Sequence, residues 1–274
     1  MQTVICLGDK ACDIGEKFEN NDNYKVKLLD IDIEGDNCFS LKRYESPEEY
    51  EKNTPNFKKF FHDISDDVLF ITSGDSELAS CSLKLLEQIK NKNISVSYII
   101  PEIEFLSETQ ILQSRAIFKI FQEYARSALF AELILLDEKN TETIIGDLPI
   151  TEVADSYNSL IYNCINSIYN LQNADPIIKY DSKPNPTNRI CSIGYYDLES
   201  DTEKLFFNLN LIQNKCYNFF INEENLKNDN TLYKKIKQKI KSKTGDNIKL
   251  SYTIHSTKNN NNYCYLKAYT KIIQ

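Results

Sequence analysis

The stretch Asp67-Val68-Leu69-Phe70-Ile71-Thr72-Ser73-Gly74-Asp75-Ser76-Glu77-Leu78 decides the fold of this chain. Its first half is an apolar run rich in β-branched and aromatic residues, which is typical of a buried strand. After Gly74 the pattern changes to helical spacing, kept by Leu78, Ser82, Leu85 and Ile89. A strand, a tight turn and a helix N-terminus present backbone N–H groups to an anion. The stretch therefore predicts an α/β fold with a candidate anion site at the turn.

The composition is that of an ordinary globular protein, and it restricts the partners we expect. The 274 residues are 41% hydrophobic and 26% charged, enough for one large domain or two small ones. The net charge of −8 argues against nucleic acid and against an acidic membrane surface. No apolar run is long enough to span a bilayer, and the N-terminus lacks a signal-peptide pattern. We therefore expect no membrane partner and a cytoplasmic location.

Glycine and cysteine usage carry further information. Glycine is scarce, with seven residues, although loops that cradle phosphates usually need it. None of the eight cysteines has CxxC spacing, so we expect buried free thiols in a reducing compartment, with disulfides as the alternative. With only His62 and His255 available, the sequence predicts neither a zinc site nor a hydrolase triad. We interpret the abundance of Asn, Lys and Ile as the codon composition of an AT-rich viral or bacterial genome.

The first half of the chain alternates strand and helix patterns, which predicts a parallel sheet covered on both faces. Ser107-Glu108-Thr109-Gln110 has the form of a capping box, and Ser46-Pro47 resembles a helix start. A short helix is expected over Asp13–Phe18. The expected strands are Thr3–Leu7, Lys25–Ile33, Val68–Thr72, Ile94–Ile100 and Leu133–Leu136.

A long helix and a polar loop divide the chain. Thr151–Leu171 is the longest helical pattern, and it ends before Asp175–Asn188, a stretch dense in proline and polar residues. We expect an N-terminal domain over residues 1–172, including the central helix over 151–172. A linker over 173–188 and a C-terminal domain over 189–274 would follow.

The C-terminal part reads as a small α+β domain of order β-α-β-α-β-β. We expect its last two strands to form a hairpin through the turn-prone run Asn259–Asn262. The expected strands are Ile190–Tyr195, Cys216–Ile221, Lys249–His255 and Tyr263–Ile272, and the expected helices are Thr202–Ile212 and Thr231–Lys241.

This order resembles that of the FtsZ/tubulin family, which has a Rossmann-like nucleotide-binding domain, a long central helix and a small α+β domain. Asp67–Gly74 looks like the strand and turn that enter the family's glycine-rich signature loop. Arg189–Gly194 looks like the first strand after its central helix. The resemblance spans nearly the whole chain. It implies a GTPase-like fold, GTP or GDP as cofactor if the pocket functions, and a filament of the cytoskeletal or cell-division type. It suits a divergent, phage-encoded member.

The glycine loops of the family are degenerate in this chain. The signature GGGTGTG would fall on Ser76–Ser82, which holds no glycine, and the first phosphate loop would fall on Gly8–Cys12, where one glycine remains. Added Cβ atoms would lie where phosphates sit. Asp75 and Glu77 would repel a triphosphate and would stabilise the helix dipole themselves, for about 0.3–1 kcal/mol each. We therefore expect a self-capped helix after Gly74 instead of a phosphate site.

The resemblance implies nucleotide contacts at a few positions if a nucleotide is retained. Asp13 falls near the base, Asn158 falls where the family reads guanine, and Asp137 falls near a base or ribose contact. An Asp after a strand, or an Asn on a helix, is more often a helix cap or a solvated side chain than a nucleotide contact. The remaining contacts would come from the two degenerate loops, at Gly8, Gly74, Asp75 and Ser76.

One acidic position resembles the catalytic position of the family. In that family a loop of one subunit supplies a carboxylate that orients the attacking water at the neighbour's nucleotide. Ile178-Lys179-Tyr180-Asp181 resembles this loop, with Asp181 at the acidic position. Lys179 replaces an asparagine, and the second acid is replaced around Pro184. A polar linker residue is therefore an equally good interpretation of Asp181.

A basic run lies in the C-terminal part. Its lysines surround Leu232, Ile236 and Ile240, whose spacing of four predicts an amphipathic helix with a solvated basic face. A specific acidic partner is the alternative interpretation. The lysines are Lys234, Lys235, Lys237, Lys239, Lys241 and Lys243.

Three functions remain open. The leading hypothesis is an FtsZ/tubulin-like protein without a cofactor or enzymatic activity. It would act by longitudinal contacts, head to tail with itself or with a host FtsZ/tubulin-like protein. The alternative is an active GTPase that binds and hydrolyses GTP and polymerises. The third is an unrelated α/β enzyme for a small molecule, which would lack the C-terminal hairpin domain.

Overall fold

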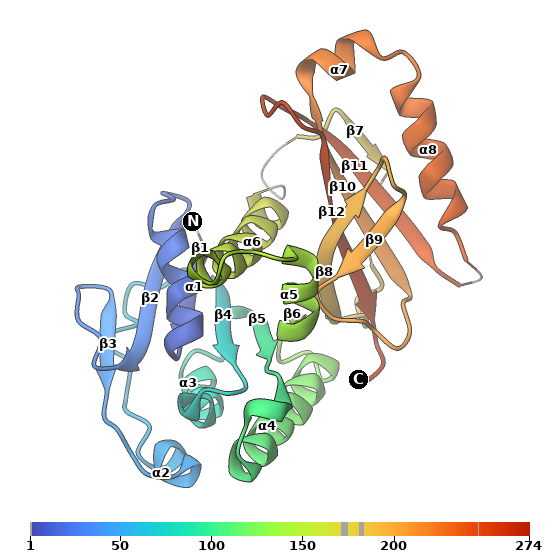
Figure 1. Cartoon of the computed structure of the whole chain (residues 1–274). Helices are drawn as coiled ribbons and strands as arrows, with labels where there is room; N and C mark the ends of the chain where they lie inside the picture. The colour runs from blue at the N-terminus through green and yellow to red at the C-terminus, as the bar shows by residue number, and fades with distance from the viewer. Residues whose placement is uncertain (1, 171–174, 181–183, 246) are drawn as a thin grey trace. The chain divides into compact units, whose positions relative to one another are not determined.

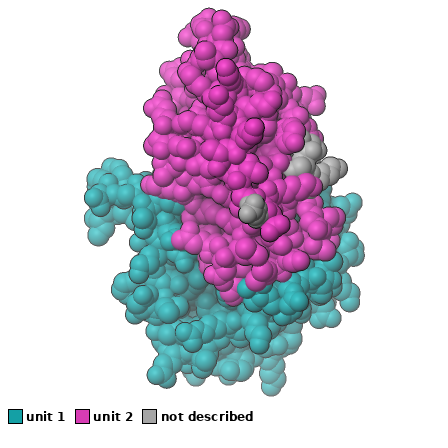
Figure 2. Space-filling model, turned by 90° about the vertical axis from the view of Figure 1, so that its right-hand side faces the viewer, with its two compact units in different colours: residues 1–162, 273 teal, residues 163–272, 274 magenta. Residues whose placement is uncertain are grey.

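The computed structural model of the chain describes residues 2–170, 175–180, 184–245 and 247–274. The chain forms two compact units, residues 1–162 with 273 and residues 163–272 with 274, which Figure 2 shows in different colours. The division falls within helix α6 (Ile150–Asn170), so this helix contributes residues to both units. The domain boundaries expected from the sequence, at 172 and 189, stay predictions.

The first unit is built on a parallel sheet (Figure 1). Its strands follow the order β3-β2-β1-β4-β5-β6, and each neighbouring pair is parallel. In β4, six consecutive residues are buried, because both faces of the sheet are covered. The predicted covered parallel sheet is confirmed. The strands are β1 (Gln2–Leu7), β2 (Tyr24–Ile31), β3 (Cys38–Leu41), β4 (Asp67–Ser73), β5 (Asn93–Ile100) and β6 (Glu132–Asp137).

The helices of this unit begin at the caps that the sequence indicates. Ser46 accepts a hydrogen bond from the Glu49 amide, with Pro47 at the first turn, and Ser107 and Gln110 form the reciprocal capping box. Both predicted helix starts are confirmed. The helices are α1 (Asp9–Glu19), α2 (Pro47–Lys52), α3 (Ser82–Gln88), α4 (Glu108–Arg126), α5 (Glu138–Ile145) and the first part of α6, with 3₁₀ turns η1 (Glu77–Cys81) and η2 (Ile103–Phe105).

The second unit is a mixed sheet packed against α8 (Figure 1). At its centre β10 runs parallel to β11 and antiparallel to β12. The apolar face of α8, with Leu232, Ile236 and Ile240, joins one buried cluster with Tyr217 and Phe219 of β10. The order is β8-β12-β10-β11-β7, with β9 paired to β8. The elements are β7 (Ile178–Tyr180), β8 (Ile190–Asp197), β9 (Thr202–Leu205), β10 (Asn214–Asn222), α7 (Glu223–Asn228), α8 (Leu232–Ser242), β11 (Lys249–Thr257) and β12 (Tyr263–Thr270).

The helix expected over Thr202–Ile212 is wrong. Residues Thr202–Leu205 form β9, which folds back antiparallel on the end of β8. Gly194 permits this close pairing, because a Cβ atom there would lie 2.0 Å from the carbonyl oxygen of Lys204. Leu205 packs against the apolar cluster, and Phe206 is fully buried. Cross-strand pairing and burial therefore override a short helical pattern.

The expected hairpin of the last two strands is also wrong. β10 lies between β11 and β12 and pairs with both, so the turn at Asn259–Asn262 joins strands that are not neighbours. Alternation of apolar and polar residues predicts a strand but not its partner, and β10 has the buried alternation that suits a central position. Within the expected linker over 173–188, Ile178–Tyr180 forms β7 and pairs with β11.

Most of the cysteines lie in the interior of the protein. All eight are free thiols, as the sequence predicts. Cys38 and Cys216 are half-buried, and the other six are buried. Burial raises the pKa of the Cys164 thiol, so this group stays protonated and unreactive. Within the described ranges, no helix is long and apolar enough to cross a bilayer.

Candidate functional site

Five of the predicted site residues lie where strands of the parallel sheet end. Gly8 follows β1, Gly74, Asp75 and Ser76 follow β4, and Asp137 ends β6. Because the strands are parallel, their carboxyl ends meet at one edge of the sheet, where ligands of such folds bind. The other two predicted nucleotide contacts come from helices, Asp13 from α1 and Asn158 from α6. The structure thus brings together segments that are far apart in the sequence.

Lys10, in the first turn of α1, connects the segments that follow β1, β4 and β6 through ion pairs. Its Nζ lies 2.6 Å from Oδ2 of Asp75 and 2.5 Å from Oε1 of Glu138. The two carboxylate side chains are 22% and 17% exposed. Burial acts to lower the pKa of Lys10, but the hydrogen bonds and charges of Asp75 and Glu138 raise it overall. The ammonium is therefore charged and already paired with two carboxylates at the edge of the sheet.

The remaining glycine of the first loop faces a side chain. Gly8 has a φ of +92°, a left-handed conformation that glycine adopts at little cost. A Cβ atom at Gly8 would lie 2.3 Å from the Oγ of Ser76. The space that glycine leaves free beside its backbone is thus occupied by Ser76 of the loop after β4. In a phosphate loop, that space admits a phosphate oxygen.

The packing around Gly74 leaves no room for a side chain. A Cβ atom at this position would lie 2.4 Å from the hydroxyl oxygens of both Tyr98 and Ser114, and 2.9 Å from Pro101. Its amide donates to the carbonyl of Ile99 at 2.9 Å. Atoms of the protein itself therefore fill the space around Gly74, and its amide is already hydrogen-bonded.

The helix after Gly74 differs from the expected self-capped helix. Its first turn is the 3₁₀ turn η1, and Ser76 at the N-cap makes no side-chain hydrogen bond to it. Asp75 accepts hydrogen bonds from the Ser73 hydroxyl and from Lys10 instead. Glu77 accepts one from the Tyr50 hydroxyl at 3.3 Å. The self-capping prediction is wrong because long-range partners of both carboxylates replace the local backbone amides.

Asp13 and Asn158 do come together, as two residues facing one nucleotide base would. The Asn158 side chain hydrogen-bonds the Asp13 carboxylate and acts to lower its pKa. Burial and the charge of Asp9 outweigh this effect, so the pKa of Asp13 is raised. Asp30 at the end of β2 has a raised pKa because of burial and the charges of Asp9 and Asp13. The carboxylates of Asp9 and Asp13 on α1 and of Asp30 on β2 therefore lie near one another.

The other two predicted positions have separate outcomes. Asp137 is the N-cap of α5, and its side chain accepts a hydrogen bond from the Asn140 amide at 2.8 Å. Asp137 is thus a helix cap, which was the alternative interpretation offered by the sequence. Asp181 lies outside the described residues, so its catalytic role stays a prediction. Its neighbour Lys179 lies on β7, opposite Thr253 of β11.

A cavity of about 400 Å³ opens beside the Lys10 contacts. Its charged groups are four carboxylates and a single ammonium, that of Lys10. Burial, followed by the charges of Glu102 and Glu138, raises the pKa of Glu142. The cavity is lined by Lys10, Asp75, Pro101, Glu102, Phe105, Leu106, Glu138 and Glu142.

Of the charged groups of this cavity, sequence reasoning identified Asp75 and missed Lys10, Glu102, Glu138 and Glu142. Glu138 directly follows the predicted Asp137, and Lys10 lies within the predicted loop Gly8–Cys12, so both were within reach of the motif. Glu102 and Glu142 carry no local signal. No cluster of three or more histidine, cysteine or acidic side chains suited to a metal ion occurs in the part of the chain that the structure describes.

Comparison with solved structures identifies the fold. An empty FtsZ dimer from M. jannaschii matches with a TM-score of 0.73 at 11% identity, over 98% of this chain and 87% of that chain. The GTPγS-form protofilament of TubZ from Bacillus thuringiensis serovar israelensis gives 0.68 at 14% identity, over 100% and 87%. The GTPγS-bound protofilament of CetZ2 from Haloferax volcanii gives 0.67 at 9% identity, over 98% and 92%.

No protein-family model matches the sequence, and no curated protein matches it either. The similarity is therefore seen in the structures, because sequence identities of 9–14% are too low to indicate a relationship by themselves. It extends over both compact units, since the matches cover nearly the whole chain. The chain has the FtsZ/tubulin-like fold.

Proposed function

We propose that this chain acts through protein contacts of the FtsZ/tubulin type, and that its GTP site is degenerate. It associates head to tail with further copies or with a filament-forming relative. The proposal of a degenerate GTP site rests on the two contacts that Lys10 makes with Asp75 and Glu138. These contacts join the loops after β1, β4 and β6, which is where a nucleotide would lie at a parallel sheet edge.

A triphosphate meets three obstacles at this edge. Its natural counter-charge, the Lys10 ammonium, is already paired with two carboxylates. Ser76 fills the space beside the Gly8 backbone. Asp75 and Glu138 would repel phosphate oxygens, at about 4 kcal/mol for each charge pair 4 Å apart in an effective dielectric of 20. The charge and the space at this edge thus both favour the protein's own groups over a triphosphate.

Association is proposed from the fold. Two of the matched structures are protofilaments, those of TubZ and CetZ2, and the FtsZ structure is a dimer. A heterologous contact that repeats without closing produces an open filament. A single copy of this fold offers both faces of such a contact, so self-association requires no further protein.

The second candidate is a GTPase that polymerises. It is favoured by the positive φ of Gly8 and by the proximity of Asp13 and Asn158, two residues at which the family resemblance implies base contacts. The third hypothesis, an unrelated α/β enzyme, required a different fold and has no support from the matched structures. The polymerising GTPase is therefore the second candidate function.

The test is the nucleotide content and affinity of the purified protein. The protein is denatured, the supernatant is chromatographed for guanine nucleotides, and GTP and GDP are titrated into native protein by calorimetry. Sedimentation with and without GTP measures association in parallel. We expect no bound nucleotide, no heat of binding and association that does not depend on GTP. Binding in the micromolar range or tighter, with GTP-dependent sedimentation, would instead establish the polymerising GTPase.

A further inference from the structure

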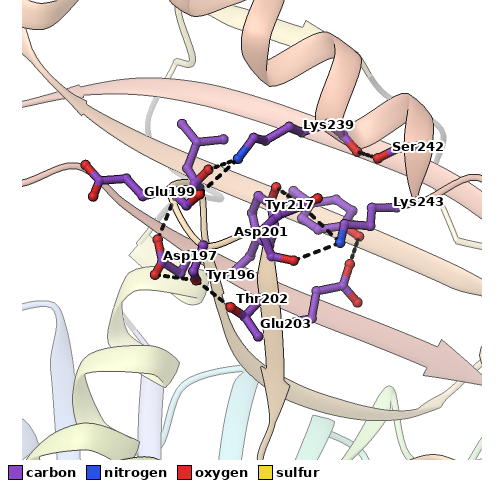
Figure 3. A network of polar contacts seen from close by, with 12 residues as sticks. Tyr196, Asp197, Glu199, Asp201, Thr202, Glu203, Tyr217, Lys239, Ser242 and Lys243 are labelled. Atoms are coloured by element: carbon purple, nitrogen blue, oxygen red, sulfur yellow. Dashed lines mark hydrogen bonds and ion pairs between the residues drawn. The ribbon is translucent and has the colours of Figure 1, made fainter.

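The lysines of α8 and of its C-cap position, Lys243, divide into two sets. One set is engaged within the unit, as Figure 3 shows for Lys239 and Lys243. Lys239 donates to the carbonyl oxygens of Leu198 and Glu199, and Lys243 lies 3.0 Å from the carboxylate of Asp201. Lys235 lies 3.2 Å from the carboxylate of Asp229. These lysines hold the turn between β8 and β9, or the start of α8, and have a structural role.

The other set forms a stripe on the outer side of α8. Lys234, Lys237 and Lys241 have i, i+3, i+7 spacing, all three are exposed, and they lie opposite the buried apolar face of the helix. The Nζ of Lys237 lies 6.0 Å from the centre of the Tyr233 ring. Tyr233 itself is 44% exposed. Three ammonium groups are thus presented to solvent without a carboxylate partner in the described ranges.

Aromatic side chains continue this surface. Tyr233 hydrogen-bonds Tyr252, and the ring of Tyr252 stacks on Tyr180 with a centre-to-centre distance of 5.6 Å. Tyr180 on the edge strand β7 is 60% exposed. We define the basic face as Lys234, Lys237 and Lys241 with Tyr233 and Tyr180. Aromatic side chains such as these are enriched at the centre of protein interfaces, whereas charged groups belong to the polar rim.

The cavity of the first unit has the opposite character. Four carboxylates face the single ammonium of Lys10, so the cavity keeps an excess of three negative charges. Phe105, which lines one wall, is 83% exposed, and its neighbour Ile103 is 44% exposed. We define the acidic face as Asp75, Glu102, Glu138 and Glu142 with Ile103 and Phe105. Neighbouring exposed apolar side chains with polar groups at their rim are a feature of protein interaction surfaces.

We propose that the acidic face of one copy binds the basic face of a second copy, with a lysine of α8 entering the cavity. The two faces are complementary in charge, and both carry exposed apolar groups. Phe105 packs against Tyr233 or Tyr180, and the ammonium compensates the carboxylates that Lys10 leaves unpaired. Such an arrangement uses apolar contact for affinity and charge for selection of the partner. This inference rests on the association proposed above and names the surfaces that carry it.

The test is a charge exchange followed by sedimentation velocity. One variant reverses the basic face, Lys234→Glu with Lys237→Glu and Lys241→Glu, and another reverses the acidic face, Glu102→Lys with Glu142→Lys. We expect each variant alone to associate at least about 10-fold more weakly than the parent chain, because like charges then meet. An equimolar mixture of the two regains association, since each reversed face then finds its complement. A chain with all five substitutions also regains it.

A matched control separates this effect from net charge. Lys52→Glu with Lys59→Glu and Lys90→Glu changes the charge by the same amount at exposed lysines of the first unit, and it associates like the parent chain. As a measurement independent of variants, carbodiimide cross-linking of the parent chain joins a lysine of the stripe to Glu102 or Glu142 of another copy.

The outcomes distinguish this inference from the proposed function. If the parent chain associates but the reversed variants associate equally well, or the cross-links form elsewhere, the assignment of these faces is wrong while the function stands. If the parent chain remains monomeric at all concentrations, self-association itself is wrong. Restoration in the mixture also shows that both variants are folded.

Discussion

Lys10 and Asp75, 65 residues apart in the sequence, form a 2.6 Å ion pair between the loops after β1 and β4. A protein that binds nucleotide at this edge would leave the lysine for a phosphate. Here the chain supplies its own anions. The two ion pairs of Lys10, with Asp75 and Glu138, connect the loops after β1, β4 and β6 within the chain itself.

Replacing Lys10 by methionine removes the charge but keeps most of the side-chain volume. Asp75 and Glu138 are then partly buried without a counter-charge, so we expect a loss of about 1–3 kcal/mol in the free energy of unfolding. Urea denaturation at neutral pH measures it. Lys17→Met is the control, because the partner of Lys17, Asp155, is 71% exposed, and that pair should contribute little. Equal losses in both variants would show that the Lys10 contacts are not special.

Gly74→Ala tests whether packing alone requires this glycine. Its Cβ atom would lie 2.4 Å from the Tyr98 and Ser114 oxygens, so we expect a loss of about 1–3 kcal/mol in unfolding free energy. At Gly245, the nearest atom to an added Cβ belongs to the flexible side chain of Ile248, at 3.3 Å. Gly245→Ala should therefore change stability by only about 0.5 kcal/mol. If Gly74→Ala left the free energy of unfolding unchanged, the loop after β4 would be able to move and accommodate the added methyl group.

Asp30→Asn should stabilise the protein at neutral pH. The folded-state pKa of Asp30 is raised by burial and by Asp9 and Asp13, so ionisation costs more in the folded chain than in the unfolded chain. The contribution of Asp30 to stability is therefore present below its ordinary value of 3.8 and is lost as the pH rises through the raised value. We expect the asparagine variant to gain about 0.5 kcal/mol at pH 7 after screening.

Unfolding curves across this pH range measure the difference between Asp30→Asn and the parent chain. The gain should disappear on acidification below the ordinary aspartate pKa, where both side chains are neutral. Asp36→Asn, at an exposed position, is the control for the removal of one carboxylate. A gain that stays constant with pH would point to a cause other than charge.

Association through the acidic face should weaken on acidification. Glu142 has a raised pKa because of burial and of Glu102 and Glu138, while Lys10 acts in the opposite direction. As the pH falls through that raised value, Glu142 takes up a proton and attracts a lysine less. Sedimentation of the parent chain from neutral pH towards the ordinary glutamate value of 4.5 should show progressively weaker association. In Glu142→Gln this part of the pH dependence should be absent, and its persistence would exclude Glu142 as the cause.

Much of the fold was predictable because its signals are local. The buried strand of β4, the capping box at Ser107 and the long pattern of α6 each lie within one stretch of sequence. The predictions failed where pairing decides the structure. β9 forms because Gly194 admits a close neighbour, and β10 separates β11 from β12. Neither fact has a signal within a single segment.

The candidate site divides in the same way. The loss of glycine between Ser76 and Ser82 is visible in the sequence, and it suffices to question a phosphate site. The family resemblance implies nucleotide contacts at Asp13 and at Asn158 separately, and the structure adds a hydrogen bond between their side chains. The sequence could not indicate that Asp75 would bind Lys10 instead of capping its own helix, because the local amides and the distant ammonium compete for the same carboxylate.

By itself the sequence determined the alternation of strands and helices, the helix starts and the absence of a glycine-rich signature loop, since each depends on residues close together in the chain. Only the tertiary structure decided which strands are neighbours, which carboxylates surround Lys10, and which lysines of α8 are engaged by Asp201 and Asp229. The physical reason is distance. An ion pair or a strand pairing depends on separation in space, and this separation is set only when the apolar faces of all the elements are buried together.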